Sequence, residues 1–595
     1  MVFQDFDLIQ ERRRQERQRK FRKRVSIAAI AIFILLILVA AGIFAVVMSK
    51  KNEEEKSQPA KGKSTHSPST SNGVVKDSEK MIKTICNGTL YQDSCLSTLQ
   101  KVVKNNPTAK TNPKDLIKLG ISATADKLEE AFTKINKLEF NTPEEKQAFE
   151  ICKQVVDDAK EELQKSADNI GDDLGKLGTN HNDTNSWLSA VMSYQENCID
   201  AFPEGKLRSN MKEAFNASQE LTSNALAMVK QMSSIISSVT QMPRGSRHLL
   251  QSGSFSLRKD GLPKWMNREE RRMLKADLDK PTPNVTIAKD GSGNFTTIND
   301  ALAAMPSKYD GRYVIFVKGG IYEEYVNITK EMVNVTIYGE GSQKSIITGN
   351  KNKVDGINTY LTATVAVMAD GFLGQAMGFR NTAGPEKEQA VALRVQADRA
   401  IFLNCRFEGY QDTLYVQAHR QFYRSCVVAG TVDFIFGDAA AIFQNCLIYV
   451  RKPMKDQQNT ITAQGRVDKF QTTGIVLQNC KIQPEDSFAS VKSEFKTYLG
   501  RPWKQYSRTV IMESTIEDLI DPAGWLAWDG DFALTTLFYA EFNNLGSGAE
   551  KDGRVKWPGL KSITKEEAKK FTVGSFLQGE WLNATSGAVH FGLFK

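Results

Sequence analysis

The stretch "AIFLNCRF" (Ala400–Phe407) decides the fold, because related segments follow it at regular intervals. The related segments are "QFYRSCVV" (Gln421–Val428), "AIFQNCLI" (Ala441–Ile448) and "GIVLQNCKI" (Gly474–Ile482). Each one places apolar residues before a cysteine that follows Asn or Ser. The first two intervals between these cysteines are almost equal, and the third is longer, as if it held an inserted loop. A period of roughly 20 residues, built from strand-like units, is typical of a solenoid.

A parallel β-helix accounts for this period, with about one coil per repeat and neighbouring coils roughly 4.8 Å apart. Equivalent residues on successive coils should then stack. We therefore expect Cys426 and Cys446 to lie close enough for a disulfide, and Cys405 and Cys480 to be buried thiols. The alternative is a ladder of buried cysteines without any bond.

The same strand-like sequence pattern begins near Asn284, where short apolar runs alternate with Gly, Asn and Asp. Examples are "YVIFVKGGIY", "VNVTIYGEG" and "ATVAVMADGF", which read as strands of about five residues separated by tight turns. We predict that residues 284–595 form an all-β, right-handed parallel β-helix.

Two aspartates, Asp412 and Asp433, lie among apolar residues, and their spacing equals the interval from Cys405 to Cys426. One coil therefore separates them, so their carboxylates should project side by side. Gln411 is adjacent, and Gln389 precedes Asp412 by slightly more than one such interval. Of two neighbouring carboxyl groups, one tends to keep its proton and the other can act as a nucleophile. Glutamine amides can stabilise an oxyanion, and Arg501 can pair with the ionised acid.

A purely structural reading of these aspartates is the alternative, because Asp and Asn often occupy solenoid turns for backbone reasons. A Ser-His-Asp hydrolase is poorly supported, since residues 291–595 contain only His419 and His590 and no G-x-S-x-G motif.

The preceding region, residues 77–242, has helical periodicity and few Gly or Pro residues. This pattern predicts an all-α antiparallel four-helix bundle. A disulfide between Cys86 and Cys95 would be a local clip, and one between Cys152 and Cys198 would join two helices. Spacing alone leaves the two other pairings of these cysteines open.

The N-terminus contains an uncharged apolar run from Val25 to Val47. This run is long enough to span a bilayer, which takes roughly 20 residues in a helix. Residues 1–72 carry most of the excess charge of the chain, and the basic tail before the run, residues 1–24, should stay in the cytosol. The length of the run favours a transmembrane signal anchor, with a cleaved signal peptide as the alternative. We therefore expect a membrane-anchored precursor in the secretory pathway, followed by a linker at residues 48–76 that is rich in Lys, Glu, Ser, Pro and Thr.

Export makes eight N-x-S/T sequons candidates for glycosylation. They begin at Asn87, Asn182, Asn216, Asn284, Asn294, Asn327, Asn334 and Asn583. In an oxidising compartment the eight cysteines favour disulfides over metal sites. The second linker, residues 243–283, contains "PRGSRHLLQSGS", which is either a protease target or an ordinary solvated linker.

Five segments together resemble the plant pectin methylesterases, in the order found in that family. They are "GIYEE" (Gly320–Glu324), "QAVALR" (Gln389–Arg394), "GYQDTLY" (Gly409–Tyr415), "DFIFG" (Asp433–Gly437) and "LGRPW" (Leu499–Trp503). The helical region resembles the pectin methylesterase inhibitor domain, and "RHLL" (Arg247–Leu250) resembles the family's processing motif. That motif usually has two basic residues, whereas the second position here is His248.

The resemblance implies hydrolysis of pectin methyl esters in the cell wall, without a metal or organic cofactor. It implies Asp433 as the nucleophile, Asp412 as the acid and base, and Arg501 as the group that orients Asp433. Gln389 and Gln411 would stabilise the oxyanion. Substrate contacts are expected at Thr359, Gln389, Tyr415, Arg501 and Trp503, with Tyr360, Trp525 and Trp528 as further candidates for aromatic contacts with sugars.

Methyl-esterified pectin, a protease acting at residues 247–250 and separate inhibitor proteins are the expected partners, with a membrane contact through residues 25–47 before processing. No nucleic acid is expected. Two alternatives remain: a pectin-backbone glycosidase that uses paired carboxylates, or a non-catalytic wall-binding or inhibitor protein.

Overall fold

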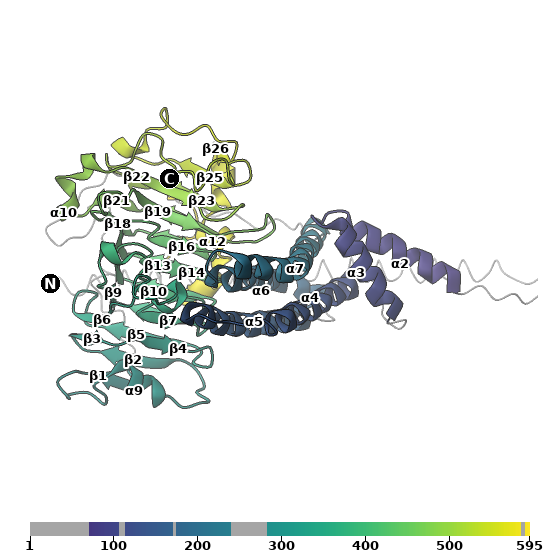
Figure 1. The fold of residues 1–595 in the computed structure, drawn as a ribbon, viewed down its shortest axis with the longest axis horizontal. Helices are drawn as coiled ribbons and strands as arrows, with labels where there is room; N and C mark the ends of the chain where they lie inside the picture. The colour runs from purple at the N-terminus through teal and green to yellow at the C-terminus, as the bar shows by residue number, and fades with distance from the viewer. Residues whose placement is uncertain (1–70, 106–112, 171–173, 240–281, 585–588, 595) are drawn as a thin grey trace, which may run out of the picture. The chain divides into compact units, whose positions relative to one another are not determined.

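The computed structural model describes residues 71–105, 113–170, 174–239, 282–584 and 589–594 (Figure 1). The predicted anchor at 25–47 and the processing motif at 247–250 lie outside these residues. Within the described part of the chain, no helix is long and apolar enough to cross a bilayer. Residues Val74–Lys595 form one compact unit, which contains both the helical region and the β-structure.

The described helices that precede the β-structure belong to the helical region. They are α2 (Ser71–Cys86), α3 (Gln92–Asn105), α4 (Pro113–Ile135), α5 (Pro143–Asn169), α6 (Leu174–Ala201) and α7 (Lys206–Val239). Helix α5 begins at a capping box. The side chain of Thr142 accepts a hydrogen bond from the backbone N–H of Glu145, and the side chain of Glu145 accepts one from the backbone N–H of Thr142. The four long helices α4 to α7 share a core of buried aliphatic and aromatic residues and form the predicted bundle (below, "the bundle").

Disulfides join Cys86 to Cys95 and Cys152 to Cys198, which confirms the two expected pairs and excludes the alternatives. The second bond holds α5 against α6, with a Cα–Cα distance of 4.2 Å.

Three parallel sheets wind into the predicted β-helix, and Figure 1 shows their strands stacked from β1 to β26. The first sheet contains β1 (Val285–Ile287), β2 (Tyr313–Val317), β5 (Val335–Gly339), β8 (Leu373–Gln375), β11 (Ala400–Leu403), β14 (Arg420–Arg424), β17 (Ala440–Gln444), β20 (Gly474–Gln478), β23 (Arg508–Met512), β25 (Phe538–Phe542) and β26 (Leu560–Lys561). The second contains β4 (Val326–Ile328), β7 (Val365–Val367), β10 (Leu393–Val395), β13 (Leu414–Val416), β16 (Ile435–Gly437), β19 (Asn459–Gln464) and β22 (Thr497–Pro502). The third contains β3 (Gly320–Glu323), β6 (Ser345–Gly349), β9 (Gly378–Asn381), β12 (Arg406–Glu408), β15 (Val427–Gly430), β18 (Leu447–Val450), β21 (Lys481–Pro484) and β24 (Thr515–Ile516).

Short helices occupy the ends and loops of the β-helix. They are α9 (Ile298–Ala303), α10 (Asp486–Ala489), α11 (Lys565–Lys569) and α12 (Val573–Phe576), with 3₁₀ turns η1 (Thr359–Leu361), η2 (Pro385–Lys387), η3 (Lys492–Glu494), η4 (Ser547–Ala549) and η5 (Gly579–Ala584).

The cysteine repeat marks the turn between the first and third sheets. The residue before each cysteine has a positive φ, for example 54° at Asn404 and 52° at Ser425. Asn tolerates this left-handed conformation better than most residues, which explains the Asn in three of the four repeats. Inside the coils, aromatic rings stack between neighbouring strands, such as Phe402 on Tyr423 and Tyr423 on Phe443.

The predicted disulfide between Cys426 and Cys446 is wrong, because both are buried thiols, as are Cys405 and Cys480. The sulfur of Cys426 donates to the carbonyl of Phe402 at 3.4 Å, and that of Cys446 donates to the carbonyl of Tyr423 at 3.6 Å. Stacked coils point equivalent side chains in the same direction, whereas a disulfide needs Cβ atoms that face each other. The prediction of unbonded thiols at Cys405 and Cys480 is confirmed.

Candidate active site

The two aspartates lie on adjacent coils, as their spacing predicts. Leu414 pairs with Ile435 and Tyr415 with Phe436, so the strand register carries each position of this coil directly onto its equivalent in the next. Asp412 and Asp433 each lie two residues before the first of these paired positions. Both have positive φ values, 60° and 50°, in the turns that lead into β13 and β16. The third member of this row is Thr460, one coil beyond Asp433.

The carboxylate of Asp433 is held by two side chains. The guanidinium of Arg501 donates from Nε at 2.8 Å and from Nη2 at 2.6 Å, which makes the ion pair bidentate. The hydroxyl of Thr460 donates to Oδ1 at 2.6 Å. Such charge-assisted bonds stabilise the ionised form and fix its orientation.

The register explains how Arg501 reaches Asp433. Tyr415, Phe436, Ala463 and Arg501 occupy one row across the second sheet. Tyr415 stacks on Phe436 with ring centroids 4.3 Å apart. The small side chain of Ala463 leaves room for Arg501 to lie back across the row towards Asp433.

Asp412 is buried and differs electrostatically from Asp433. Burial, followed by the charge of Asp433, raises the pKa of Asp412 well above its ordinary value, and Arg501 only partly opposes this. Its environment therefore favours the neutral acid beside an ionised partner. This is the arrangement that general acid–base catalysis by two carboxyl groups requires.

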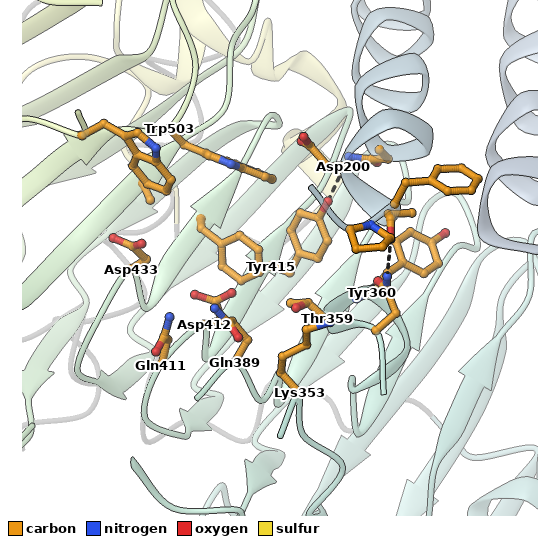
Figure 2. A pocket seen from close by; sticks show the side chains of 18 of the residues that line it. Asp200, Lys353, Thr359, Tyr360, Gln389, Gln411, Asp412, Tyr415, Asp433 and Trp503 are labelled. Carbon is orange, nitrogen blue, oxygen red and sulfur yellow. Dashed lines mark hydrogen bonds between the residues drawn. The ribbon is translucent and has the colours of Figure 1, made fainter. Parts of the chain in front are cut away.

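These groups line a cleft of about 410 Å³ over the second sheet (Figure 2). From the β-helix, the cleft is lined by Lys353, Asn358, Thr359, Tyr360, Gln389, Gln411, Asp412, Tyr415, Asp433, Phe436, Ala463, Arg501, Trp503 and Trp528. The five predicted catalytic residues are all in this set, and so are Thr359, Tyr415 and Trp503, whereas Trp525 is not. Gln389 lies two residues before the register partner of Asp412, and its side-chain oxygen is buried without a hydrogen-bond partner among the described residues.

Comparison with known proteins places this architecture. The Pectinesterase family profile matches residues 284–580, and the Plant invertase/pectin methylesterase inhibitor profile matches residues 80–228. The Arabidopsis thaliana protein named pectinesterase/pectinesterase inhibitor 45 is 52% identical over 610 aligned residues, which cover 100% of both chains. The chain belongs to the pectinesterase family.

Two further relatives agree with this assignment. Pectinesterase 3 of Citrus sinensis is 43% identical, covering 86% of this chain and 88% of its own. The solved structure of pectin methylesterase from carrot matches with a TM-score of 0.52 and 50% identity, over 52% of this chain and 98% of that one.

The bundle of this pectinesterase completes the cleft wall. The lining residues that it contributes are Asn197, Asp200, Ala201, Phe202, Pro203 and Arg208, from the end of α6 and the start of α7. Asn197 donates to the hydroxyl of Tyr415 at 3.0 Å, and the side chain of Asn358 donates to the carbonyl of Ala201 at 2.8 Å. Figure 2 shows Asp200 on the helix side of the cleft and Asp412 and Asp433 on the strand side.

Charge pairs fasten the bundle to the β-helix. Lys504, next to Trp503, donates to Glu196 at 2.7 Å and to Asp200 at 2.9 Å. Although burial alone would lower it, the pKa of Lys504 is raised by these two carboxylates. At the far end of the contact, Arg399 and Arg420 pair with Asp183 of α6.

Three aromatic predictions have different outcomes. Trp528 is 36% exposed, and Arg501 lies against its ring at 4.4 Å. Tyr360 lines the cleft but is buried beneath the bundle, with the guanidinium of Arg394 over its ring. Trp525 is only 1% exposed and donates to Glu541, so its predicted contact with sugar is wrong.

Sequence reasoning missed Thr460, Lys353 and the cleft residues of α6. A Thr in a strand carries no catalytic signature, and the coil from Asp433 to Thr460 is longer than the coil before it because of an extended loop. The sequons at Asn87, Asn216, Asn284, Asn294, Asn327 and Asn334 are exposed, and Asn182 is half-buried. Their glycosylation stays a prediction.

Proposed function

We propose that this pectinesterase cleaves pectin methyl esters with Asp433 as the nucleophile, and that its bundle holds the enzyme inactive. The observation that carries the proposal is the asymmetry of the stacked acids. Both carboxyl groups are buried, but Asp433 is paired with Arg501, whereas the pKa of Asp412 is strongly raised.

In the first half-reaction, Asp433 attacks the ester carbonyl carbon and forms a tetrahedral oxyanion. The amides of Gln389 and Gln411 donate to that oxygen. The carbon–methoxy bond then breaks, the leaving oxygen takes the proton of Asp412, and methanol departs. An acyl-enzyme remains on Asp433.

In the second half-reaction, the ionised Asp412 removes a proton from water as that water attacks the acyl carbon. The bond to Asp433 breaks, and the galacturonate carboxylic acid is released. Both aspartates return to their starting states, and the sum is ester plus water giving acid plus methanol.

Inhibition by the bundle is supported by the residues of α6 and α7 that line one wall of the cleft, and by the direct hydrogen bond from Asn197 to Tyr415. A polymeric substrate has to reach Asp433 past these residues. We further propose that a membrane-anchored precursor enters the secretory pathway and is cut near Leu250, which releases residues 251–595 for action in the cell wall.

Side-by-side assays of methanol release test both halves of the proposal. The full-length chain should be much less active than residues 251–595, and equal activity would refute inhibition by the bundle. Asp433→Asn should abolish methanol release from either form. New reducing ends without methanol would instead support the glycosidase alternative.

A charge-reversal variant tests the inhibitory contact in the intact chain. Glu196→Lys with Asp200→Lys places repulsive charges against Lys504 and should raise the activity of the full-length protein. The matched control is Asp126→Lys with Glu213→Lys, which changes two exposed acids of the same bundle. Equal activity of the two double variants would count against the contact.

A further inference from the structure

A second cavity, of about 430 Å³, lies beside the cleft and is lined by four cationic side chains. These are Arg466, Lys469, Arg508 and Lys561, and together they define the basic pocket. Its other lining residues are polar or apolar, and no Asp or Glu is among those that the structure describes.

The basic pocket begins where the cleft ends. Arg466 follows Gly465, which packs closely against Trp503: a Cβ atom added to this glycine would lie 2.8 Å from the ring of Trp503. Trp503 lines the cleft, and the backbone of Tyr506, three residues further on, donates to the carbonyl of Arg466. One connection of the β-helix, between β22 and β23, therefore borders both cavities.

The four cations lack carboxylate partners, since none of them forms an ion pair with any described residue. Arg508 donates to the backbone carbonyl of Gln471 at 3.2 Å, and Arg466 donates to the carbonyls of Tyr506 and Lys469. The exposed fraction of Arg466 is only 5%, and its Nε has no hydrogen-bond partner in the described part of the chain.

Two acids lie near the basic pocket, but both are engaged elsewhere. Asp438 accepts from Gln471 and Thr473, and burial raises its pKa to about 7. Asp468 accepts from Ser223 of α7 and from the backbone of Phe470.

The arrangement lowers the pKa values of the buried cations. Burial, and then the charge of Arg466, lower the pKa of Arg508 well below its ordinary value. Burial also lowers the pKa of Arg466 to about 10. Lys230 of α7 is affected in the same direction, because its pKa is lowered by burial and then by Arg508 and Arg466. A bound anion would relieve this mutual repulsion.

We propose that the basic pocket binds a carboxylate-bearing stretch of the polysaccharide, the de-esterified galacturonate that the reaction produces, outside the cleft. Arginine and lysine match carboxylate groups through charge-assisted bonds, which a methyl ester cannot accept equally. Trp503 lines the cleft and Tyr506 lines the basic pocket, so a polymer chain that extends from the cleft past Trp503 would reach the basic pocket. The choice of polymer rests on the proposed function; the binding of a carboxylate does not.

Binding measurements on the full-length chain test this site, because neither Lys469 nor Lys561 lines the cleft. The probes are a fully de-esterified galacturonate oligomer of about ten units, its fully methyl-esterified counterpart and inorganic phosphate. The oligomer should bind, and Lys469→Gln with Lys561→Gln should weaken it about tenfold or more. The control, Lys455→Gln with Lys556→Gln, removes two exposed lysines elsewhere and should leave affinity unchanged.

Three results would overturn the proposal: equal affinity of the two double variants, equal binding of the methyl-esterified oligomer, or binding of phosphate as tight as that of the oligomer. The last would define a site for small anions. The methanol assay is independent of these measurements. Loss of methanol release with lysine-dependent binding would therefore refute the proposed function and leave the basic pocket standing.

Discussion

Arg501 holds the carboxylate of Asp433 with three hydrogen bonds although 68 residues separate them in the chain. The stacking of the coils brings the two residues together in space, because Arg501 occupies the same row as Phe436 and Ala463. The planar guanidinium satisfies both carboxylate oxygens at once. An ammonium group cannot reproduce this geometry.

Arg501→Lys should therefore lower kcat for methanol release by about a hundredfold or more, with an unchanged melting temperature. The charge is kept, so the loss would report orientation and not charge. A variant with wild-type kcat would show that the bidentate geometry is dispensable.

Ala463→Leu should mimic this loss without touching a charged group. The larger side chain would fill the space through which Arg501 reaches Asp433. The same substitution at a core alanine such as Ala441 would not serve as a control, because Ala441 is fully buried and a leucine there would disturb the β-helix core. Ala463→Gly serves better, since it keeps the space open and should retain most of the activity measured by methanol release.

Thr460→Val removes one hydroxyl that donates to Asp433 at 2.6 Å and keeps the shape of the side chain. The loss of a bond to a charged group should lower kcat by about ten- to a hundredfold. The hydroxyl of Thr460 also accepts from the backbone N–H of Asp433, so turn geometry has to be checked. Unchanged circular dichroism with reduced kcat would assign the effect to the carboxylate.

The sequence predicted what the coil period controls. Asp412 and Asp433 could be placed side by side because their spacing equals one coil, and the strand register bears this out. Thr460 was missed because its coil is longer. Where loop lengths vary, the spacing in the sequence no longer predicts which residues stack. Cys426 and Cys446 were placed correctly on neighbouring coils, but spacing does not report the direction in which side chains point.

Contacts between the bundle and the β-helix were beyond sequence reasoning for another reason. Asn197 and Tyr415 are 218 residues apart, and no repeat relates a helix of the bundle to a coil. Periodicity in the sequence predicts which residues are buried within the bundle or within the β-helix. The contact between the two depends on the final shapes of both surfaces. Asp200 and Lys504 therefore read as ordinary surface charges until the structure brings them together.

Acidic pH should tighten the contact between the bundle and the β-helix. Glu162 of α5 is buried at this contact, 3.8 Å from His419, and burial raises its pKa against the opposing effects of His419 and Lys165. Asp158, one turn earlier, faces Gln396 and Lys330, and burial raises its pKa as well.

The sign follows from linkage. Both acids bind protons more tightly in the closed chain than when exposed to water, so their contribution to closure is fully present below their ordinary pKa values. It is lost as the pH rises through the raised values. Full-length protein should therefore gain activity relative to residues 251–595 as the pH rises.

Glu162→Gln with Asp158→Asn should flatten this dependence, because the amides stay neutral at every pH. The measurement is the ratio of methanol release by the full-length chain to that by residues 251–595, taken at each pH so that the pH dependence of the catalytic step itself cancels. Glu213→Gln, an exposed acid of α7, is the matched control and should keep the wild-type slope. The same slope in the double variant would rule out Glu162 and Asp158 as the source.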